Sequence, residues 1–319
     1  MEQWSNLLSN DIEISALTTR LLVLIFVLAI EHILTISASY HPGSLWKFLA
    51  IKLAHKSKHR PPKQQYISGV ISTIILLSFS LLITYAILLF ATYPWFFELI
   101  FLLLAVTSTP LLKNCTVIYA SLLKDKKSLA REQLNNVCIR DTKALSIMGI
   151  VKGNIEGTIQ QFSLHYFTPI LMYLLGGIYA LMFYGLTISL AQYWSPKQTK
   201  YRSFGRFPNA IKDVITIPFN ILLAVLIAIL FGFKHLSIKR NSWHRFGAGV
   251  LLATTANAMH RELGGAVMYD GIKIRRPKLG TQMPPELNDI KDLSRLIKRL
   301  RQSIIMTIAF SALFVLFLP

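Results

Sequence analysis

The sequence predicts an all-α, polytopic integral membrane protein with roughly four to six membrane-embedded helices and amphipathic cytoplasmic helices. Of its 319 residues, 53% are hydrophobic and only 15% are charged, whereas about 25% of the residues of a soluble domain carry a charge. Long apolar runs alternate with dense basic stretches, which is typical of a chain that passes repeatedly through lipid. We expect a single membrane domain over residues 1–319.

The formal net charge of +19 bears on the partners of the protein. In a soluble protein such a charge would suggest nucleic acid. In a membrane protein it reflects the excess of Lys and Arg in cytoplasmic loops, and it attracts anionic lipid or phosphorylated ligands. We therefore expect no nucleic-acid partner. The expected cytoplasmic segments are about 47–65, 113–155 and 234–302.

The first half of the chain contains three apolar runs, Leu21 to Ala38, Ile67 to Thr92 and Phe96 to Leu112. Residues 1–19 contain no Lys or Arg, whereas 47–65 contain six and no acid. This contrast predicts that the N-terminus lies outside and that 47–65 lies in the cytoplasm. The second and third runs predict a helical hairpin with its turn outside.

The next two apolar runs, 162–194 and 214–233, allow two topologies. If each run spans once, the basic loop 197–213 falls outside, against the charge rule for short loops. If the pair Gly176-Gly177 breaks the first run into a re-entrant segment, the loop lies inside and 214–233 does not span. We favour this second arrangement. It implies a polar cavity open to the cytoplasm, because re-entrant backbone needs protein or water around it.

The C-terminal region mixes polar helices with loops. We expect an amphipathic stretch near 247–260, a loop from Gly264 to Pro285, a charged helix over about 285–301 and a final apolar run over 303–318. Amphipathic helices are also expected within 122–139.

Two sites contain acids that suit metal or phosphate chemistry, although no familiar local phosphate cradle occurs. The first is Arg140-Asp141-Thr142, where Arg suits bidentate phosphate contact and Asp suits Mg²⁺. A solvated turn or a helix cap is the alternative. The second is Glu156, an ionisable group close to an apolar run. Its alternative is a capping or snorkelling acid at the membrane edge.

A third site runs from Lys200-Tyr201-Arg202 to Asp213 and could neutralise a phosphorylated substrate. Contact with lipid headgroups is the alternative reading.

A fourth site runs from His244 to Gly280. Its repeated glycines, among them Gly264, Gly265 and Gly271, suggest backbone that approaches a ligand or needs a positive φ. A plain surface loop is the alternative.

Several short motifs follow one another in a characteristic order. They are His41-Pro42, Arg140-Asp141-Thr142, Glu156, Pro169, Gly176-Gly177, Tyr184, Lys200-Tyr201-Arg202, Phe204-Gly205, Asp213, His244, Leu263-Gly264-Gly265, Tyr269, Gly271, Pro277 and Leu279-Gly280. In this order they resemble the CobD/CbiB family of cobalamin biosynthesis, the adenosylcobinamide-phosphate synthases. The similarity runs along nearly the whole chain.

The chain departs from the family pattern where acids are expected. Gln160 and Gln161 replace an acid and an Asn, Leu164 replaces the following acid, and Lys212 replaces the first acid of a pair. In these losses the chain resembles, more distantly, the AmpE-type membrane proteins linked to β-lactamase induction. The retained Arg140-Asp141-Thr142 and the C-terminal glycines favour the synthase side.

The resemblance implies a multi-pass protein of the bacterial inner membrane that joins adenosylcobyric acid to aminopropanol or its phosphate through an amide, using ATP and Mg²⁺. It implies catalytic roles for Asp141, Glu156 and Asp213, with Asp141 and Glu156 holding Mg²⁺. Substrate binding is expected of Arg140, Thr142, Lys200, Tyr201, Arg202, His244, Gly264, Gly265, Tyr269 and Gly271. The expected partners are the corrinoid substrate, anionic lipid and other membrane enzymes of the late cobalamin pathway. The competing function is that of a non-catalytic, AmpE-like regulatory or scaffold protein.

Overall fold

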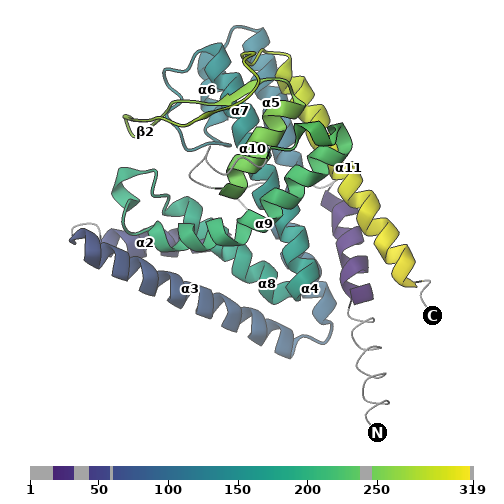
Figure 1. Ribbon diagram of the computed structural model, residues 1–319. Helices are drawn as coiled ribbons and strands as arrows, with labels where there is room; N and C mark the ends of the chain where they lie inside the picture. The colour runs from purple at the N-terminus through teal and green to yellow at the C-terminus, as the bar shows by residue number, and fades with distance from the viewer. Residues whose placement is uncertain (1–16, 32–42, 58–59, 238–245, 317–319) are drawn as a thin grey trace.

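The computed structural model describes residues 17–31, 43–57, 60–237 and 246–316, most of them helical (Figure 1). A helix covers residues 17–31. It is followed by α2 (Gly43–Ser57), α3 (Pro62–Phe90), α4 (Pro94–Ala105), α5 (Thr109–Leu123), α6 (Lys127–Leu134), α7 (Ile147–Phe162), α8 (Thr168–Tyr193), α9 (Arg206–Phe231), α10 (Phe246–Ala258) and α11 (Asp289–Leu316). Short 3₁₀ turns cover Thr199–Tyr201 and Phe233–His235, and a π-helical turn, Ser163–Phe167, joins α7 to α8.

Four helical stretches are long and apolar enough to cross a membrane: Pro62–Phe90, Pro94–Leu123, Ile147–Tyr193 and Arg206–Phe231. The predicted all-α, polytopic membrane fold is therefore confirmed. The expected hairpin differs in its packing, because α4 turns away from α3 and packs mainly against α8.

The third of these stretches, Ile147–Tyr193, is too long for one straight span. Its length would be about 70 Å as an ideal helix, more than twice the roughly 30 Å of a hydrocarbon core. It breaks at Gly176-Gly177, as predicted, and Gly177 has a φ of +62°. Only glycine adopts this conformation readily, so the glycine pair determines where the helix bends. The re-entrant path of the segment stays a prediction.

The basic loop 197–213 lies beside α2 and the beginning of α3. The indole N–H of Trp194, where α8 ends, donates to the carbonyl oxygen of Ala50 in α2 at 3.0 Å. On α3, a Cβ built on Gly69 would lie 2.1 Å from the carbonyl oxygen of Phe204. These contacts bring the loop to the same end of the bundle as the first basic segment. The second predicted topology puts the two segments on one side of the membrane, and the contacts support that part of it.

The third predicted apolar run is interrupted between α4 and α5, and Glu31 fills the break. Its buried carboxylate accepts hydrogen bonds from the backbone N–H groups of Ser108 at 2.8 Å and Thr109 at 2.9 Å. These N–H groups have no partner within the helix, and an acid there also complements the helix dipole. Arg301 of α11 lies 3.8 Å from the second oxygen of Glu31. Glu31 therefore ties the first helix to α5 and α11.

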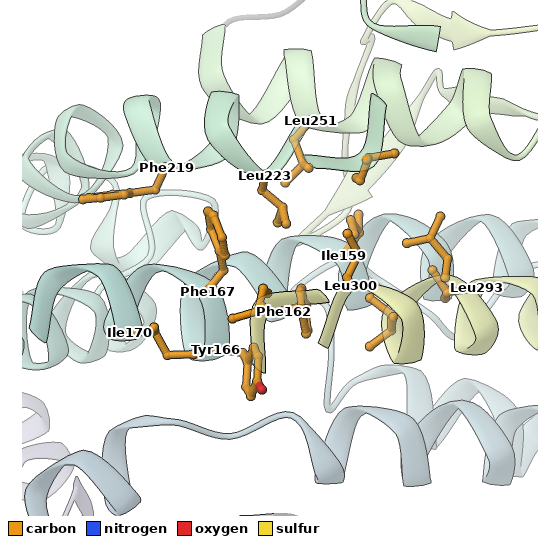
Figure 2. Close-up of a cluster of buried hydrophobic side chains, with 14 of the residues drawn as sticks. Ile159, Phe162, Tyr166, Phe167, Ile170, Phe219, Leu223, Leu251, Leu293 and Leu300 are labelled. Atoms are coloured by element: carbon orange, nitrogen blue, oxygen red, sulfur yellow. The ribbon is translucent and has the colours of Figure 1, made fainter. Parts of the chain in front are cut away.

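The main core forms where α7, α9, α10 and α11 meet (Figure 2). Phe162 of α7, Leu223 of α9, Leu251 of α10 and Leu293 of α11 are all fully buried. Helix α7 packs on α10 and α11, and the π-helical turn that follows it packs on α9, so α7 is anchored within this core.

The prediction of an amphipathic stretch near 247–260 is wrong. Residues 250–256 of α10 are buried without exception. The hydroxyl of Thr255 donates to the carbonyl oxygen of Leu251 at 2.8 Å, and that of Thr254 accepts from the N–H of Ser237. These polar side chains are satisfied inside the protein and need no contact with water.

The region expected to be a loop from Gly264 to Pro285 contains two small antiparallel sheets. In one, β1 (Glu262–Gly264) pairs with β4 (Lys278–Gly280), and in the other, β2 (Val267–Tyr269) pairs with β3 (Ile272–Ile274). The charged helix and final apolar run that follow form one continuous helix, α11.

Candidate functional site

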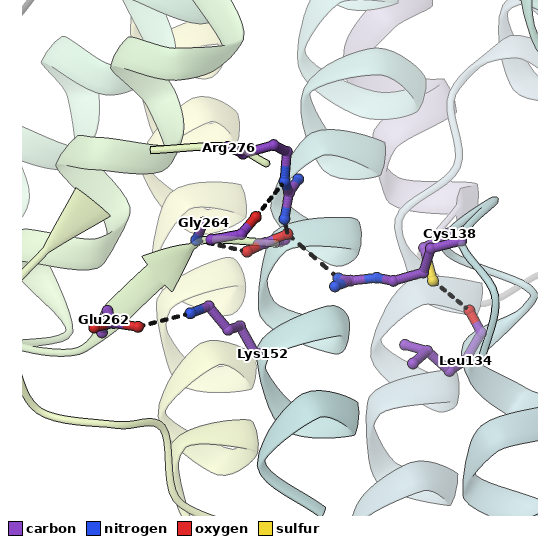
Figure 3. A network of polar contacts seen from close by, with 9 residues as sticks. Leu134, Cys138, Lys152, Glu262, Gly264 and Arg276 are labelled. Carbon is purple, nitrogen blue, oxygen red and sulfur yellow. Dashed lines mark hydrogen bonds and ion pairs between the residues drawn. The ribbon is translucent and has the colours of Figure 1, made fainter. Parts of the chain in front are cut away.

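The carboxylate of Glu156 lies at the centre of a buried polar network. Figure 3 shows this network, with its members Gly264 and Arg276 labelled. Glu156 projects from α7 and is 3% exposed. One oxygen accepts a hydrogen bond from the backbone N–H of Gly264 at 2.7 Å. The other lies 2.8 Å from the Nη2 atom of Arg276 and 3.3 Å from that of Arg140. Two guanidinium groups therefore share one carboxylate.

The backbone at Gly264-Gly265 makes this network possible. Both glycines have positive φ angles, +78° and +80°, which a side chain would disfavour. This turn directs the N–H of Gly264 at Glu156, and the carbonyl oxygen of Gly265 accepts from Arg276 Nε at 3.1 Å. The pairing of β1 with β4 positions Arg276, just before β4, over the same carboxylate.

A second ion-pair cluster adjoins this turn on the side of β1 and β4. Lys152 of α7 lies 3.0 Å from one oxygen of Glu262, and Lys278 lies 2.9 Å from the other. The hydrogen bond from Lys278 is the main cause that lowers the pKa of Glu262. This cluster fixes β1 and β4 on α7.

The β2–β3 hairpin connects two of the predicted sites. Its turn, Asp270-Gly271, has positive φ at both residues, the geometry of a tight two-residue hairpin. The N–H of Gly271 donates to the carboxylate of Asp141 at 2.8 Å. Asp270 accepts from the N–H of Thr199 at 2.8 Å. The hairpin thus joins the Arg140-Asp141 turn to the loop after α8.

A pocket of about 290 Å³ opens beside Glu156. The charged side chains that line it come from five different parts of the chain. They are Arg140, Glu156, Lys197, Lys212 and Arg276. Four of these carry positive charge and one carries negative charge, so the lining is basic.

Neutral polar side chains complete the pocket. They include Gln160, Gln161, Gln192, Ser195, Asn209 and Tyr269. Gln192 lies 2.8 Å from the ring nitrogen Nε2 of His165 in the π-helical turn. The amide of Asn209 donates to carbonyl oxygens at the end of α8 and at the start of α9. Several of the residues that replace family acids therefore lie at the pocket wall.

The protonation states of two lining residues follow from their surroundings. Burial disfavours the charged guanidinium of Arg140, but Glu156, Cys138 and Tyr269 together outweigh this effect, and the pKa of Arg140 is raised. Burial also raises the pKa of Tyr269, while Arg276 and Arg140 act in the opposite direction. At neutral pH the pocket therefore presents a cation and a protonated phenol, which can donate a hydrogen bond.

The structure brings together some of the predicted site residues. Arg140, Glu156, Gly264, Gly265 and Tyr269 lie around the pocket and the network. Asp141 and Gly271 bind each other at its edge.

Other predicted residues lie apart from the pocket. Thr142 is buried, and its hydroxyl donates to Asn135 at 3.0 Å. Lys200 lies over the ring of its neighbour Tyr201. Arg202 is exposed, and Asp213 pairs with Lys212.

His244 lies outside the described residues. The functional roles assigned to all of these residues stay predictions.

The surroundings of Glu156 do not fit a Mg²⁺ ion held by protein carboxylates. Mg²⁺ requires six oxygen ligands at short distance, but both oxygens of Glu156 already accept hydrogen bonds from N–H groups. The carboxylate of Asp141 binds Gly271. In the part of the chain that the structure describes, no group of three or more His, Cys, Asp and Glu could hold a metal ion. The surroundings of Glu156 are instead those of a carboxylate that is paired with two arginine side chains.

Comparison with known proteins decides the family. The family model described as CobD/Cbib protein matches residues 24–297. This chain belongs to the CobD/Cbib family. The match includes both the helices that form the core and the strands that carry Gly264 and Tyr269, so the whole site described above lies within the family region.

Individual relatives are distant. The cobalamin biosynthesis protein CobD of Chromobacterium violaceum is 28% identical over 206 residues, covering 62% of this chain and 65% of that protein. The protein of the same name from Stutzerimonas stutzeri is 25% identical over 201 residues, covering 62% and 66%. The one from Leptospira interrogans covers 60% and 64% at 28% identity. The chain thus spans less than two thirds of the length of these relatives, and no solved structure matches it.

Sequence reasoning did not identify Arg276 and Lys197 as site residues. Arg276 lies in a stretch with three other basic residues, Lys273, Arg275 and Lys278, and nothing in the sequence distinguishes it. The hairpin had a signal, since Asp270-Gly271 stands between two short apolar, β-branched or aromatic segments, which predicts a tight turn. That hairpin would have brought Arg276 back towards Gly264.

Proposed function

We propose that this protein acts in cobalamin biosynthesis as an adenosylcobinamide-phosphate synthase. In this reaction the carboxyl group of adenosylcobyric acid and the amine of aminopropanol, or of its phosphate, form an amide. Membership of the CobD/Cbib family supports the pathway, and the relatives are named cobalamin biosynthesis protein CobD. The observation that carries the proposal is the basic pocket at Glu156, because carboxylate and phosphate groups are both anions.

The lining residues suit binding and charge stabilisation. Cations and hydrogen-bond donors that are fixed before the reaction stabilise the negative charge that develops on oxygen atoms during acyl transfer. Arg276 is held by Glu156 and by the carbonyl oxygen of Gly265, so its position is set without substrate. Tyr269 supplies a neutral donor nearby. Together these groups orient an anionic reactant.

Activation of the carboxyl group is proposed to use ATP, as the family resemblance implies. An amide forms from a free carboxylate only when one carboxyl oxygen is first converted into a better leaving group. Both oxygens of the Glu156 carboxylate accept hydrogen bonds from N–H groups, so this residue does not hold a metal ion for that step. Dependence on ATP is measured directly as consumption of nucleotide by the purified protein.

The proposed location is a bacterial inner membrane, with several spans and the pocket facing the cytoplasm. The four apolar helical stretches and the excess of basic residues support this location. Proximity of the loop 197–213 to the first basic segment supports a common cytoplasmic side.

Helix α2 supports the proposed contact with anionic lipid. One of its faces packs against α8 through Ala50 and Ala54. Its exposed face carries Phe48 and Ile51 next to Lys47 and Lys52. Apolar and cationic side chains on one exposed face are typical of a helix that lies in the membrane interface. The corrinoid substrate and other membrane enzymes of the late pathway are the remaining proposed partners.

Genetic complementation tests the function. The chain is expressed in a bacterium that lacks its own synthase and is supplied with cobyric acid and aminopropanol. We expect growth that depends on cobalamin, and we expect Arg276→Gln to abolish it while the exposed substitution Lys124→Gln does not. A chain that is expressed and inserted but gives no growth would refute the synthase function and favour an AmpE-like, non-catalytic role.

A further inference from the structure

We propose that the pocket beside Glu156 binds a phosphate or carboxylate anion directly on its own cations, without a metal ion between ligand and protein. The inference rests on the proposed function only for the identity of the natural ligand. The binding site is argued from the side chains that line the pocket.

The charges of the lining favour an anion. Glu156 is shared between Arg140 and Arg276, and a single carboxylate cannot neutralise two guanidinium groups. Lys197 and Lys212 reach the pocket from the loop after α8 and from α9. Because these four cations are partly or fully buried, water screens their charge less than it would at the surface.

The neighbouring acid Asp213 compensates part of the charge of Lys212, but it does so from outside the cavity. Asp213 lies 3.2 Å from Lys212, but its side chain is 31% exposed and does not line the pocket. A ligand anion inside the cavity would approach Lys212 from the other side. Charge-assisted hydrogen bonds of this kind are about twice as strong as neutral ones.

The same charges oppose a metal ion. A divalent cation in the pocket would lie among four positive side chains, and its one nearby carboxylate already accepts three hydrogen bonds. Amide side chains stand at Gln160, Gln161 and Gln192. Such neutral groups can donate hydrogen bonds to an anion, whereas they are weaker ligands than carboxylates for Mg²⁺.

The volume of the pocket limits the size of the ligand. About 290 Å³ lies at the lower end of the range of about 300–1,000 Å³ for sites that enclose drug-sized molecules. A corrinoid is much larger than this. The pocket therefore accommodates a small phosphorylated or carboxylated compound, or the anionic end of a larger one.

Calorimetric titration of the full-length protein in a neutral detergent tests the inference, with inorganic phosphate as the probe. Phosphate is titrated in the presence of EDTA and again in the presence of Mg²⁺. We expect phosphate to bind in EDTA, with an affinity that Mg²⁺ changes by less than about twofold. Binding that requires Mg²⁺ would overturn the inference, and so would the absence of binding in both conditions.

Three substitutions locate the binding site. Lys197→Gln and Lys212→Gln should each weaken phosphate binding about tenfold, since each removes one charge-assisted hydrogen bond. Lys124→Gln makes the same change of charge at an exposed position outside the pocket, and it should leave the affinity within about twofold. Equal affinities for all three variants would place the bound phosphate elsewhere. Thermal unfolding of each variant shows that its fold is retained.

Reversal of one charge gives a sharper result. Lys212→Asp should abolish phosphate binding in EDTA, because the new carboxylate repels the anion. Unchanged binding by this variant would contradict the inference. The titrations separate it from the proposed synthase function: phosphate binding without complementation refutes only the function, whereas complementation without metal-free binding refutes only the anion site.

Discussion

Glu156 and Gly264 are 108 residues apart in the sequence, yet the backbone N–H of Gly264 donates to the Glu156 carboxylate at 2.7 Å. This hydrogen bond joins α7 to the strands of the C-terminal region. Together with Arg140 and Arg276, it makes Glu156 the residue on which the geometry of the pocket depends.

Replacement of Glu156 should therefore destabilise the protein. Glu156→Gln leaves the two guanidinium groups of Arg140 and Arg276 without their common anion, and loss of one partner of a buried pair costs about 3–5 kcal/mol. Thermal unfolding in detergent measures the loss. Glu262→Gln is a matched control, because the Glu262 side chain is 20% exposed and its loss should cost much less. Similar unfolding temperatures for the two variants would show that the buried network contributes little.

The two glycines of the turn should differ in their tolerance of a side chain. In Gly264→Ala the new Cβ would lie 2.2 Å from the carbonyl oxygen of Pro277, whereas at Gly265 its nearest neighbour is Lys152 Nζ at 3.7 Å. Both variants bear the cost of a positive φ, about 1–2 kcal/mol. Only Gly264→Ala should also displace β4, and this variant should therefore support less growth in the complementation assay. A comparison of growth and unfolding temperature checks this difference, and equal effects would contradict the described turn.

A similar pair of glycines tests the packing of α8 against α9. A Cβ on Gly205 would lie 1.6 Å from the carbonyl oxygen of Trp194, whereas Gly185 has open space around it. We expect Gly205→Ala to prevent accumulation of folded protein in the membrane. Gly185→Ala should be neutral or stabilise α8 by up to about 1 kcal/mol. Yields of monodisperse protein measure both, and a normal yield of Gly205→Ala would argue against this close approach.

Accessibility of introduced cysteines tests the topology. Lys63→Cys at the beginning of α3 and Lys200→Cys in the loop after α8 are both exposed, and they should react with an impermeant thiol reagent only from the cytoplasmic side. The background carries Cys138→Ser, and the remaining Cys115 is buried. Reaction of the two positions from opposite sides would exclude the re-entrant arrangement.

Glu262 should contribute to the loss of stability of the protein at acidic pH. The hydrogen bond from Lys278 is the main cause that lowers the pKa of Glu262 below its ordinary value of 4.5. The stabilisation is therefore present above that ordinary value and is lost as the pH falls through the lowered pKa. Between about pH 6 and about pH 3, wild type should lose more thermal stability than Glu262→Gln. Parallel pH profiles for the two proteins would contradict this prediction.

The sequence predicted the parts of the fold that depend on local chemistry. Gly176-Gly177 predicted the break in a long apolar run, because glycine alone tolerates the required φ. The prediction that α10 is amphipathic was wrong. In the sequence, Thr254 and Thr255 suggest a polar face on this helix. Their hydroxyl groups in fact bond to other groups inside the protein.

The candidate site could be predicted only in part. The resemblance to a known family singled out Arg140, Glu156 and Gly264, which the structure brings together. Long-range pairing decided the rest. Lys197 and Arg276 reach the pocket because the loop after α8 and the β2–β3 hairpin fold over it, and no local pattern of basic residues predicts which of them faces inward.

The break between α4 and α5 has a consequence for biogenesis. The helix that carries Glu31 is synthesised 77 residues before Ser108, and Arg301 follows only near the end of the chain. During synthesis the carboxylate of Glu31 therefore lacks all of these partners until α5 has been made. An unpaired acid in lipid is unfavourable. We therefore expect the first helix to reach its final position only after the start of α5 supplies the N–H groups that bind Glu31. We thus expect the first helix and α5 to take up their final positions together, and not one helix at a time in the order of synthesis.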